Sequence, residues 1–126
     1  MLGYLWLVLL ACVPPVYQTG KASWYGRELR GNPTASGEKF RPWKRTAAHP
    51  TLPFGTVVLV ERPDTGDHVR VVINDRGPYA KGRIIDLSQK AAHRLDMIDA
   101  GVATVELYIV GCKKKYSDRN NDCTEQ

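Results

Sequence analysis

Two aspartates that stand eleven positions apart have the clearest potential for chemistry. Asp75 follows the apolar run 71–73, and Asp86 follows the isoleucine pair 84–85. The residues after Asp75, Arg-Gly-Pro, predict a turn, because glycine tolerates positive φ and proline fixes its own φ. Two strands joined by this loop can bring both carboxylates to one edge of a β structure, which would form an acid/base site. An alternative stays open, in which Asp75 caps the turn and Asp86 caps the following helix.

Glu38 and His49 are the other candidate dissociable groups. Glu38 lies in a stretch rich in Gly, Asn, Pro, Thr and Ser, which predicts a loop. Loops carry function more often than their share, although a single glutamate there is more often only solvated. A lone histidine is likewise more often a surface or packing residue, and Pro50 favours an extended His49. The histidines and cysteines lack zinc-type spacing, so we predict no metal and no cofactor.

Several elements must position these side chains. Strands are expected over residues 21–25, 56–62, 68–73 and 103–110, and a short helix over 88–95. Ser88 is a good N-cap for that helix, and residues 62–67 have the composition of a hairpin turn. In the strand after this turn, Val69, Val71 and Ile73 share one face. The residues alone therefore predict a small β-barrel with helical insertions and a polar groove.

Length and charge limit the classes of function. The chain has 126 residues, which suffices for one domain with a modest core. Its formal net charge of +5 favours polyanionic partners such as nucleic acid, anionic lipid or cell-wall polymer, although a merely soluble basic surface is as common. Apart from three consecutive lysines at 113–115, the basic residues are scattered, and no nucleic-acid motif accompanies them. We therefore expect no nucleic-acid partner.

Five ordered motifs, together with the stretch around the two aspartates, resemble the rare lipoprotein A (RlpA) family. That stretch reads Asn-Asp-Arg-Gly-Pro at 74–78 and Gly-Arg-Ile-Ile-Asp-Leu-Ser at 82–88. The other motifs are GKASWYG at 20–26, TASGE at 34–38, TAAH at 46–49, LPFGT at 52–56 and GVATV at 101–105. The resemblance implies a mainly β fold, a six-stranded double-psi β-barrel with one or two short helices over residues 20–111.

The resemblance also implies an activity. RlpA-like proteins include lytic transglycosylases, which cleave peptidoglycan between N-acetylmuramic acid and N-acetylglucosamine, leave a 1,6-anhydro end and favour strands without stem peptides. Asp75 is expected to be the acid/base, with Glu38 and His49 orienting or tuning it. Asp86 is the main rival for the acid role, because related barrels place an essential aspartate at the matching position. Three weaker candidates for sugar contacts are Thr34, Ser36 and Tyr25.

Two other functions remain compatible with the same residues. One is a non-catalytic glycan-binding lipoprotein, since expansins loosen walls without hydrolysis. The other is a structural envelope protein that binds a division or wall-synthesis partner. Release of anhydro products from glycan distinguishes the enzyme from the binding protein.

The N-terminus resembles a lipoprotein signal. Residues 1–11 have the length of a signal-peptide apolar region and are too short to span a bilayer. Leu-Leu-Ala-Cys at 9–12 resembles a lipobox, which implies lipidation of Cys12 and a tether over 12–19. No basic residue precedes the apolar run, and a buried strand or helix is the alternative reading. Lipidation would place the protein in the bacterial envelope, and Val13 favours the outer membrane where one exists.

The C-terminal residues 112–126 are predicted to be a polar tail. It is too short for the peptidoglycan-binding SPOR domain of many family members, so we expect no such domain. If Cys12 is lipidated, Cys112 and Cys123 remain as an even pair that can form a disulfide in an oxidising compartment. Two free thiols are the alternative.

Overall fold

A computed structural model describes residues 14–113, 115 and 123. Six strands make up most of it: β1 Gln18–Tyr25, β2 Thr46–Ala48, β3 Thr56–Glu61, β4 His68–Asp75, β5 Arg83–Ser88 and β6 Ala103–Cys112. A 3-10 turn, η1, spans Arg27–Leu29, and one α-helix, α2, spans Gln89–Arg94. Within these residues, no helix is long and apolar enough to cross a membrane.

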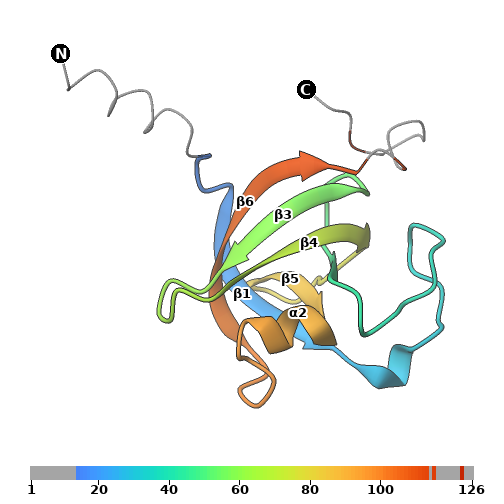
Figure 1. Cartoon of the computed structure of the whole chain (residues 1–126), viewed down its shortest axis with the longest axis horizontal. Coiled ribbons are helices and arrows are strands. Elements are labelled where there is room, and N and C mark those ends of the chain that lie inside the picture. Colours follow the sequence, from blue (N-terminus) through green and yellow to red (C-terminus); the bar gives the residue numbers. More distant parts are fainter. Residues whose placement is uncertain (1–13, 114, 116–122, 124–126) are drawn as a thin grey trace.

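The strands close into a barrel in the order β1-β5-β2-β4-β3-β6 (Figure 1). The pairs β1·β5 and β2·β4 are parallel, and the other four neighbours are antiparallel. Because the sheet closes on itself, each strand has a hydrogen-bonded neighbour on both sides. The prediction of a mainly β, six-stranded barrel is therefore confirmed.

Alternation along the strands builds the core. In β4, Val69, Val71 and Ile73 are at most 4% exposed, while Arg70 between them points outward. Val58 and Val60 of β3 face the same interior and are fully buried. Because side chains alternate across a strand, this pattern leaves one face of each strand outside the barrel for polar residues. The predicted shared face of β4 is confirmed.

The predicted helix and hairpin are also present. The Ser88 hydroxyl accepts a hydrogen bond from the Ala91 N–H at 3.3 Å and so caps α2. Between β3 and β4, the Gly66 N–H donates to the Arg62 carbonyl at 2.8 Å. Gly66 has a φ of 80°, which glycine adopts at little cost. Figure 1 shows this hairpin on the opposite side of the barrel from the long connection between β1 and β2.

Three boundaries differ from those expected from the sequence. The first strand begins at Gln18, so the expected tether over 12–19 overlaps it. The last strand continues to Cys112, the first residue of the expected polar tail. The segment Thr46–Ala48, which had no predicted structure, is a strand with β4 and β5 on its two sides. Three small residues give no measurable periodicity, so β2 is defined by its neighbours and not by local pattern.

Candidate active site

The two aspartates lie in one row of residues that crosses four neighbouring strands. Ser23 of β1 pairs with Asp86 of β5, Asp86 pairs with Ala48 of β2, and Ala48 pairs with Asp75 of β4. We call these four residues the aspartate row. Two strand spacings separate the aspartates, which corresponds to roughly 10 Å between their Cα atoms. The sequence-based prediction that both carboxylates reach one region of the barrel agrees with this register.

A bulge in β4 gives Asp75 its direction. Ile73 pairs with Ala47 and both point into the core, while Asp75, and not Asn74, pairs with Ala48. Without the extra residue, alternation would turn Asp75 into the core with Ile73. Bulges re-aim side chains in this way and are common beside active sites. Asn74 is thus the residue that places Asp75 on the same face as Asp86.

Backbone N–H groups hold the Asp75 carboxylate. Its Oδ1 accepts hydrogen bonds from the N–H groups of Ala35 and Arg76, each at 2.9 Å. Ala35 belongs to the connection between β1 and β2, forty positions earlier in the chain. The two donors fix the carboxylate at the exit of β4, where the loop toward β5 begins.

A hydroxyl holds the Asp86 carboxylate. The Ser23 Oγ donates a hydrogen bond to Asp86 Oδ1. The guanidinium of Arg83 donates to that same Ser23 oxygen at 3.1 Å. This chain of contacts orients Asp86 and provides positive charge three positions away on β5. Ser23 was missed in the sequence, where a serine beside two aromatic residues carries no signal of its own.

Tyr25 interacts electrostatically with both aspartates. Burial raises the pKa of its phenol, and the negative charges of Asp75 and Asp86 raise that pKa further. The hydroxyl is buried, and the described residues provide it with no hydrogen-bond partner. The Tyr25 ring packs on Phe40 with 4.6 Å between centroids. A neutral phenol beside two carboxylates can donate a hydrogen bond to a substrate oxygen.

The loop 34–38 rests on the end of β4. The Ser36 N–H donates to the Asn74 carbonyl at 3.2 Å, and Ala35 holds Asp75 as described above. The Thr34 hydroxyl donates to the Glu38 carbonyl at 2.8 Å and lies 3.0 Å from the Ser36 hydroxyl. Thr34 is only 8% exposed, so its hydroxyl closes the loop. Of the two predicted sugar contacts here, Ser36 is the more accessible.

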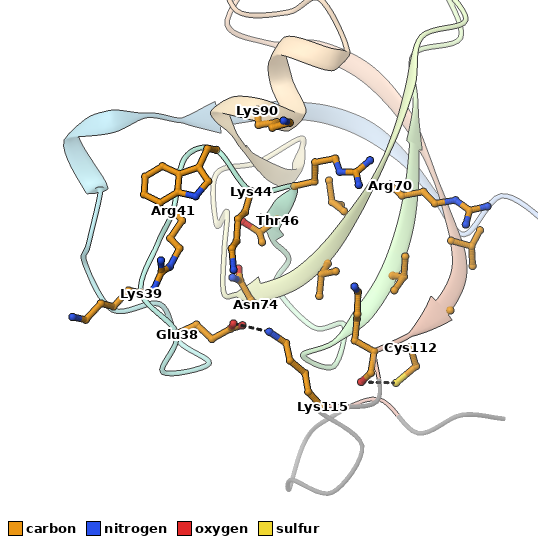
Figure 2. A pocket seen from close by; sticks show the side chains of 18 residues that line it. Glu38, Lys39, Arg41, Lys44, Thr46, Arg70, Asn74, Lys90, Cys112 and Lys115 are labelled. Atoms are coloured by element: carbon orange, nitrogen blue, oxygen red, sulfur yellow. Dashed lines mark hydrogen bonds and ion pairs between the residues drawn. The ribbon is translucent and has the colours of Figure 1, made fainter.

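Glu38 is paired with a lysine and not with a residue of the aspartate row in the described contacts. Its Oε2 forms an ion pair with the Lys115 ammonium at 2.9 Å. Both line a cleft of about 940 Å³ between the loop 38–46 and the outer faces of β4, β3 and β6 (Figure 2). We call this cleft the basic groove. No hydrogen bond or ion pair among the described residues joins the Glu38 side chain to Asp75, so any influence of Glu38 on Asp75 passes through the loop.

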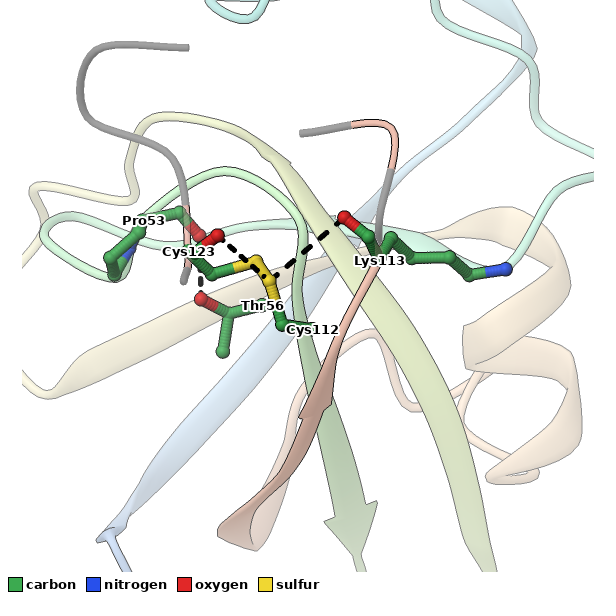
Figure 3. Close-up of a disulfide and its surroundings, with 5 residues drawn as sticks. All are labelled: Pro53, Thr56, Cys112, Lys113 and Cys123. Carbon is green, nitrogen blue, oxygen red and sulfur yellow. Dashed lines mark hydrogen bonds between the residues drawn. A yellow bond between two sulfur atoms is a disulfide. The ribbon is translucent and has the colours of Figure 1, made fainter. Parts of the chain in front are cut away.

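A disulfide closes one end of the basic groove. Cys112, which lines the groove, is bonded to Cys123 (Figure 3). The Cys123 N–H donates to the Phe54 carbonyl at 3.0 Å, and the Lys113 N–H donates to the Gly55 carbonyl at 2.9 Å. Both ends of this C-terminal ring are therefore hydrogen-bonded to the turn before β3. Cys123 is 8% exposed. This residue of the expected polar tail is therefore buried.

His49 supports the site through its backbone. Its N–H donates to the Asp75 carbonyl at 3.1 Å, while its Nε2 lies 2.9 Å from Gln18 Oε1. Its Nδ1 accepts N–H bonds from the two residues after Pro50, at 3.2 and 3.1 Å. Burial, and secondarily the Arg76 guanidinium, lowers the pKa of His49 to about 4. The ring is therefore neutral near pH 7 and does not touch either carboxylate in the described contacts.

Lowering the pH is expected to destabilise the protein through His49. The unfolded chain binds the proton at about pH 6.5 and the folded chain at about pH 4, so the unfolded state binds more protons between these values. The His49 contribution to the free energy of unfolding is complete above pH 6.5 and is lost as the pH falls toward 4, by roughly 1–3 kcal/mol. Urea unfolding at pH 7 and pH 4.5 measures this loss.

The matched variants are His49→Gln and His93→Gln. The first removes the titrating ring and should flatten the pH dependence in this window. The second replaces an exposed histidine and should keep the wild-type dependence. The same loss of stability in all three proteins would contradict a role for His49.

One more side chain near the site was missed. Tyr79, in the loop that joins the two aspartate strands, is 81% exposed. An exposed aromatic ring in this loop offers a flat surface for a substrate ring. The sequence signal was its position directly after Gly77-Pro78, in a loop flanked by the two aspartates.

Comparisons with known proteins agree with this geometry. Residues 17–107 match the protein-family model described as lytic transglycolase. The chain is similar to a probable endolytic peptidoglycan transglycosylase, RlpA, of Treponema pallidum, with 48% identity over 120 residues. That match covers 94% of this chain but only 38% of the relative, so the chain spans well under half of that protein's length.

Two solved structures share the fold. The Streptomyces papain inhibitor has a TM-score of 0.62 and 26% identity, and the match covers 79% of this chain and 100% of the inhibitor. The apo expansin of Clavibacter michiganensis has a TM-score of 0.58 and 25% identity, covering 74% of this chain and 50% of the expansin. The barrel is thus similar to an inhibitor and to an expansin as well as to transglycosylases.

Proposed function

Because the chain belongs to the lytic transglycolase family, we propose that it is a lytic transglycosylase acting on the glycan strands of peptidoglycan. The match also confirms the resemblance to RlpA and the double-psi β-barrel inferred from the sequence. The observation that carries the proposal is the aspartate row, in which two carboxylates share one face of the barrel beside a neutral phenol. The bond cleaved is the one between N-acetylmuramic acid and N-acetylglucosamine.

The reaction needs one group that acts first as acid and then as base. The carboxylic acid of Asp75 protonates the leaving oxygen as the C1–O bond breaks. The resulting carboxylate takes the proton from the C6 hydroxyl, whose oxygen attacks C1 and closes a 1,6-anhydro ring. This resembles the acid-then-base switch of retaining glycosidases, with the sugar hydroxyl in place of water. Asp86 provides negative charge beside the positive charge that develops at C1, and Tyr25 donates to a sugar oxygen.

Glu38 and His49 are assigned as positioning residues. His49 holds the Asp75 backbone through its N–H, and Glu38 lies in the loop whose Ala35 N–H holds the Asp75 carboxylate. Neither side chain needs to reach the reacting atoms in this scheme. Asp86 remains the rival for the acid role, because it lies in the same row and is the only other carboxylate in it.

Product analysis tests the proposal. Wild-type protein is incubated with glycan strands from which an amidase has removed the stem peptides, and the soluble products are analysed by mass spectrometry. Products that end in 1,6-anhydro-N-acetylmuramic acid support a lytic transglycosylase, and faster release than from peptide-bearing strands supports the preference for strands without stem peptides. Products with ordinary reducing ends, which contain one more molecule of water than the anhydro products, would indicate a hydrolase.

A non-catalytic glycan-binding protein is the second candidate. The similarity to the Clavibacter michiganensis expansin favours it, since that barrel has 25% identity to this chain. Under this reading, the aspartate row and Tyr25 bind sugar hydroxyls without breaking a bond. Co-sedimentation with glycan without release of anhydro products would support the binding protein against the enzyme.

Lipidation at Cys12 is proposed as the means of localisation. Residues 1–13, which hold the proposed signal and Cys12, lie outside the described residues. The proposal rests on the Leu-Leu-Ala-Cys sequence after an apolar run. Lipid on Cys12 would attach the barrel to the cell membrane or outer membrane, facing the cell wall.

Cys12→Ala is expected to move the protein from the membrane fraction to the soluble periplasm, or to leave it unprocessed. Fractionation with immunoblotting measures the shift, and mass spectrometry of the wild-type N-terminus detects the acyl chains. The control is Cys123→Ala, which removes one sulfur of the disulfide and should leave the fractionation unchanged. Equal membrane retention of Cys12→Ala and wild type, with no lipid on the wild type, would refute the anchor.

A further inference from the structure

The segment that the disulfide closes is held against the turn before β3. We call this segment, from Cys112 to Cys123, the C-terminal ring (Figure 3). The structure describes four of its residues, namely Cys112, Lys113, Lys115 and Cys123. The Lys113 N–H donates to the Gly55 carbonyl at 2.9 Å, and the Cys123 N–H donates to the Phe54 carbonyl at 3.0 Å. Both ends of the ring are therefore fixed to one turn, and the disulfide fixes them to each other.

The same turn holds Arg76, whose N–H is one of the two donors to the Asp75 carboxylate. The Arg76 guanidinium donates to the Leu52 carbonyl at 2.7 Å and to the His49 carbonyl at 3.2 Å. It also lies 4.0 Å from the centroid of the Phe54 ring, where a cation is attracted to the aromatic face. The Arg76 N–H in turn donates to Asp75 Oδ1 at 2.9 Å. One path from the C-terminal ring to the carboxylate therefore passes through Phe54 and Arg76.

Lys115 connects the C-terminal ring to the loop that supplies the other donor. Its ammonium forms the ion pair with Glu38 Oε2 at 2.9 Å (Figure 2). The Glu38 carbonyl accepts hydrogen bonds from the Thr34 N–H at 2.7 Å and from the Thr34 hydroxyl at 2.8 Å. The next residue, Ala35, donates its N–H to Asp75 Oδ1 at 2.9 Å. A second path to the same carboxylate therefore passes through Lys115, Glu38 and the loop 34–38.

We propose that the C-terminal ring positions the carboxylate of Asp75 for catalysis, and that Lys115 is a positioning residue within this ring. Both N–H groups that hold Asp75 Oδ1 lie on segments that the ring contacts, so the ring fixes the two donors relative to each other. This inference rests on the proposed function and deepens it. A misplaced catalytic group can lower a rate by about 10²-fold, even when the cause lies away from the reacting atoms. The glycan need not touch the ring, so loss of the ring contacts should lower kcat and leave KM unchanged.

Replacement of Lys115 tests the path through the loop. Lys115→Gln should lower kcat for release of anhydro products by about two- to fivefold at unchanged KM, because a partly exposed ion pair contributes little. Lys115→Arg can keep the ion pair and should retain the wild-type kcat. Lys113→Gln makes the same charge change in the same ring, keeps its backbone bond to Gly55, and should also match wild type. A wild-type kcat for Lys115→Gln, or an equal loss in Lys113→Gln, would overturn the inference.

A double variant shows whether Lys115 acts through Glu38. Lys115→Gln and Glu38→Gln each remove the same ion pair, so the protein that carries both should lose no more kcat than the weaker of the two single variants. This non-additivity would support a path from the ring to the loop through the pair. Losses in kcat that multiply in the double variant would show two independent effects and overturn the assignment of Lys115.

Opening the disulfide tests both paths together. Dithiothreitol reduces the bond to two thiols and is itself oxidised to a cyclic disulfide. Reduced protein should lose kcat by about tenfold or more and regain it when oxidised glutathione re-forms the bond. The variant with both Cys112→Ser and Cys123→Ser should show the lower kcat with or without dithiothreitol. Because a disulfide also stabilises the fold, all rates are measured well below each unfolding temperature. A lower unfolding temperature with unchanged kcat would show a purely structural ring and overturn the inference.

Amide hydrogen exchange tests the positioning without relying on catalysis. NMR of isotopically labelled full-length protein gives the exchange rates of the Ala35 and Arg76 N–H groups. Lys115→Gln should raise the rate at Ala35 by about two- to fivefold, reduction should raise both rates, and Lys113→Gln should change neither. These changes in a protein whose wild type releases no anhydro product would support the positioning role of the ring and refute the enzyme. Unchanged exchange in Lys115→Gln and in reduced protein, with normal release of anhydro products, would overturn the inference and leave the enzyme intact.

Discussion

Replacing Asp75 with asparagine is expected to lower the rate of glycan cleavage by about 10²–10⁴-fold, the usual contribution of general acid–base catalysis. Asparagine has the same shape and keeps an Oδ1 that can accept the N–H bonds of Ala35 and Arg76. The fold should therefore survive while the proton transfer is lost. Mass spectrometry of anhydro products measures the rate, and thermal unfolding measures the stability.

The matched control for this variant is Asp99→Asn, which makes the same chemical change at an exposed site. It should keep the wild-type rate. Glu38→Gln and His49→Ala should impair cleavage less than Asp75→Asn. Both variants keep the backbone N–H groups that bind Asp75 and remove only side-chain contacts that hold this backbone in place. Full activity of a folded Asp75→Asn protein would remove Asp75 from the acid role.

Asp86→Asn is expected to reduce cleavage by about 10²-fold, which is typical for loss of one preorganised electrostatic contact. The substitution removes the negative charge next to the sugar carbon that becomes positive, while asparagine can still accept the Ser23 hydroxyl bond. Cleavage rates at saturating glycan isolate this effect from binding. Ser23→Ala, which leaves the charge and removes only its orienting partner, should cost less.

Stability data separate the roles that Asp86 can have. A folded but inactive Asp86→Asn protein beside an active Asp75→Asn protein would move the acid role to Asp86. A large drop in unfolding temperature for Asp86→Asn would instead make it a structural residue, since its carboxylate accepts the hydrogen bond of Ser23, whose hydroxyl oxygen in turn accepts one from Arg83. A stable Asp86→Asn protein with wild-type activity would exclude it from the mechanism.

Local pattern in the sequence determined much of the barrel. Val69, Val71 and Ile73 alternate with polar residues, so the inward face of β4 could be predicted from period two alone. Ser88 before an apolar helical face predicted the start of α2 for an equally local reason, because its hydroxyl caps an N–H three residues later. Asp75 and Asp86 were also identified as candidates from the sequence, because each follows an apolar run.

Register was decided only by the tertiary structure. The bulge at Asn74 depends on how β4 pairs with β2, a three-residue strand that lies more than twenty positions earlier. Simple alternation would have turned Asp75 into the core, and no local signal marks the extra residue. The same holds for Ser23, which meets Asp86 across 63 positions of sequence. Contacts between distant strands depend on sheet order, which periodicity does not encode.

The direction of Glu38 and the basic groove were likewise decided by the fold. The sequence identified Glu38 as a carboxylate in a loop but could not show that it forms an ion pair with Lys115. The groove cations extend from Lys39 to Lys115, and apart from the lysines at 113–115 they are scattered in the sequence. Chemical identity and local pattern belong to the sequence, while proximity between residues far apart in the chain arises only when the barrel closes.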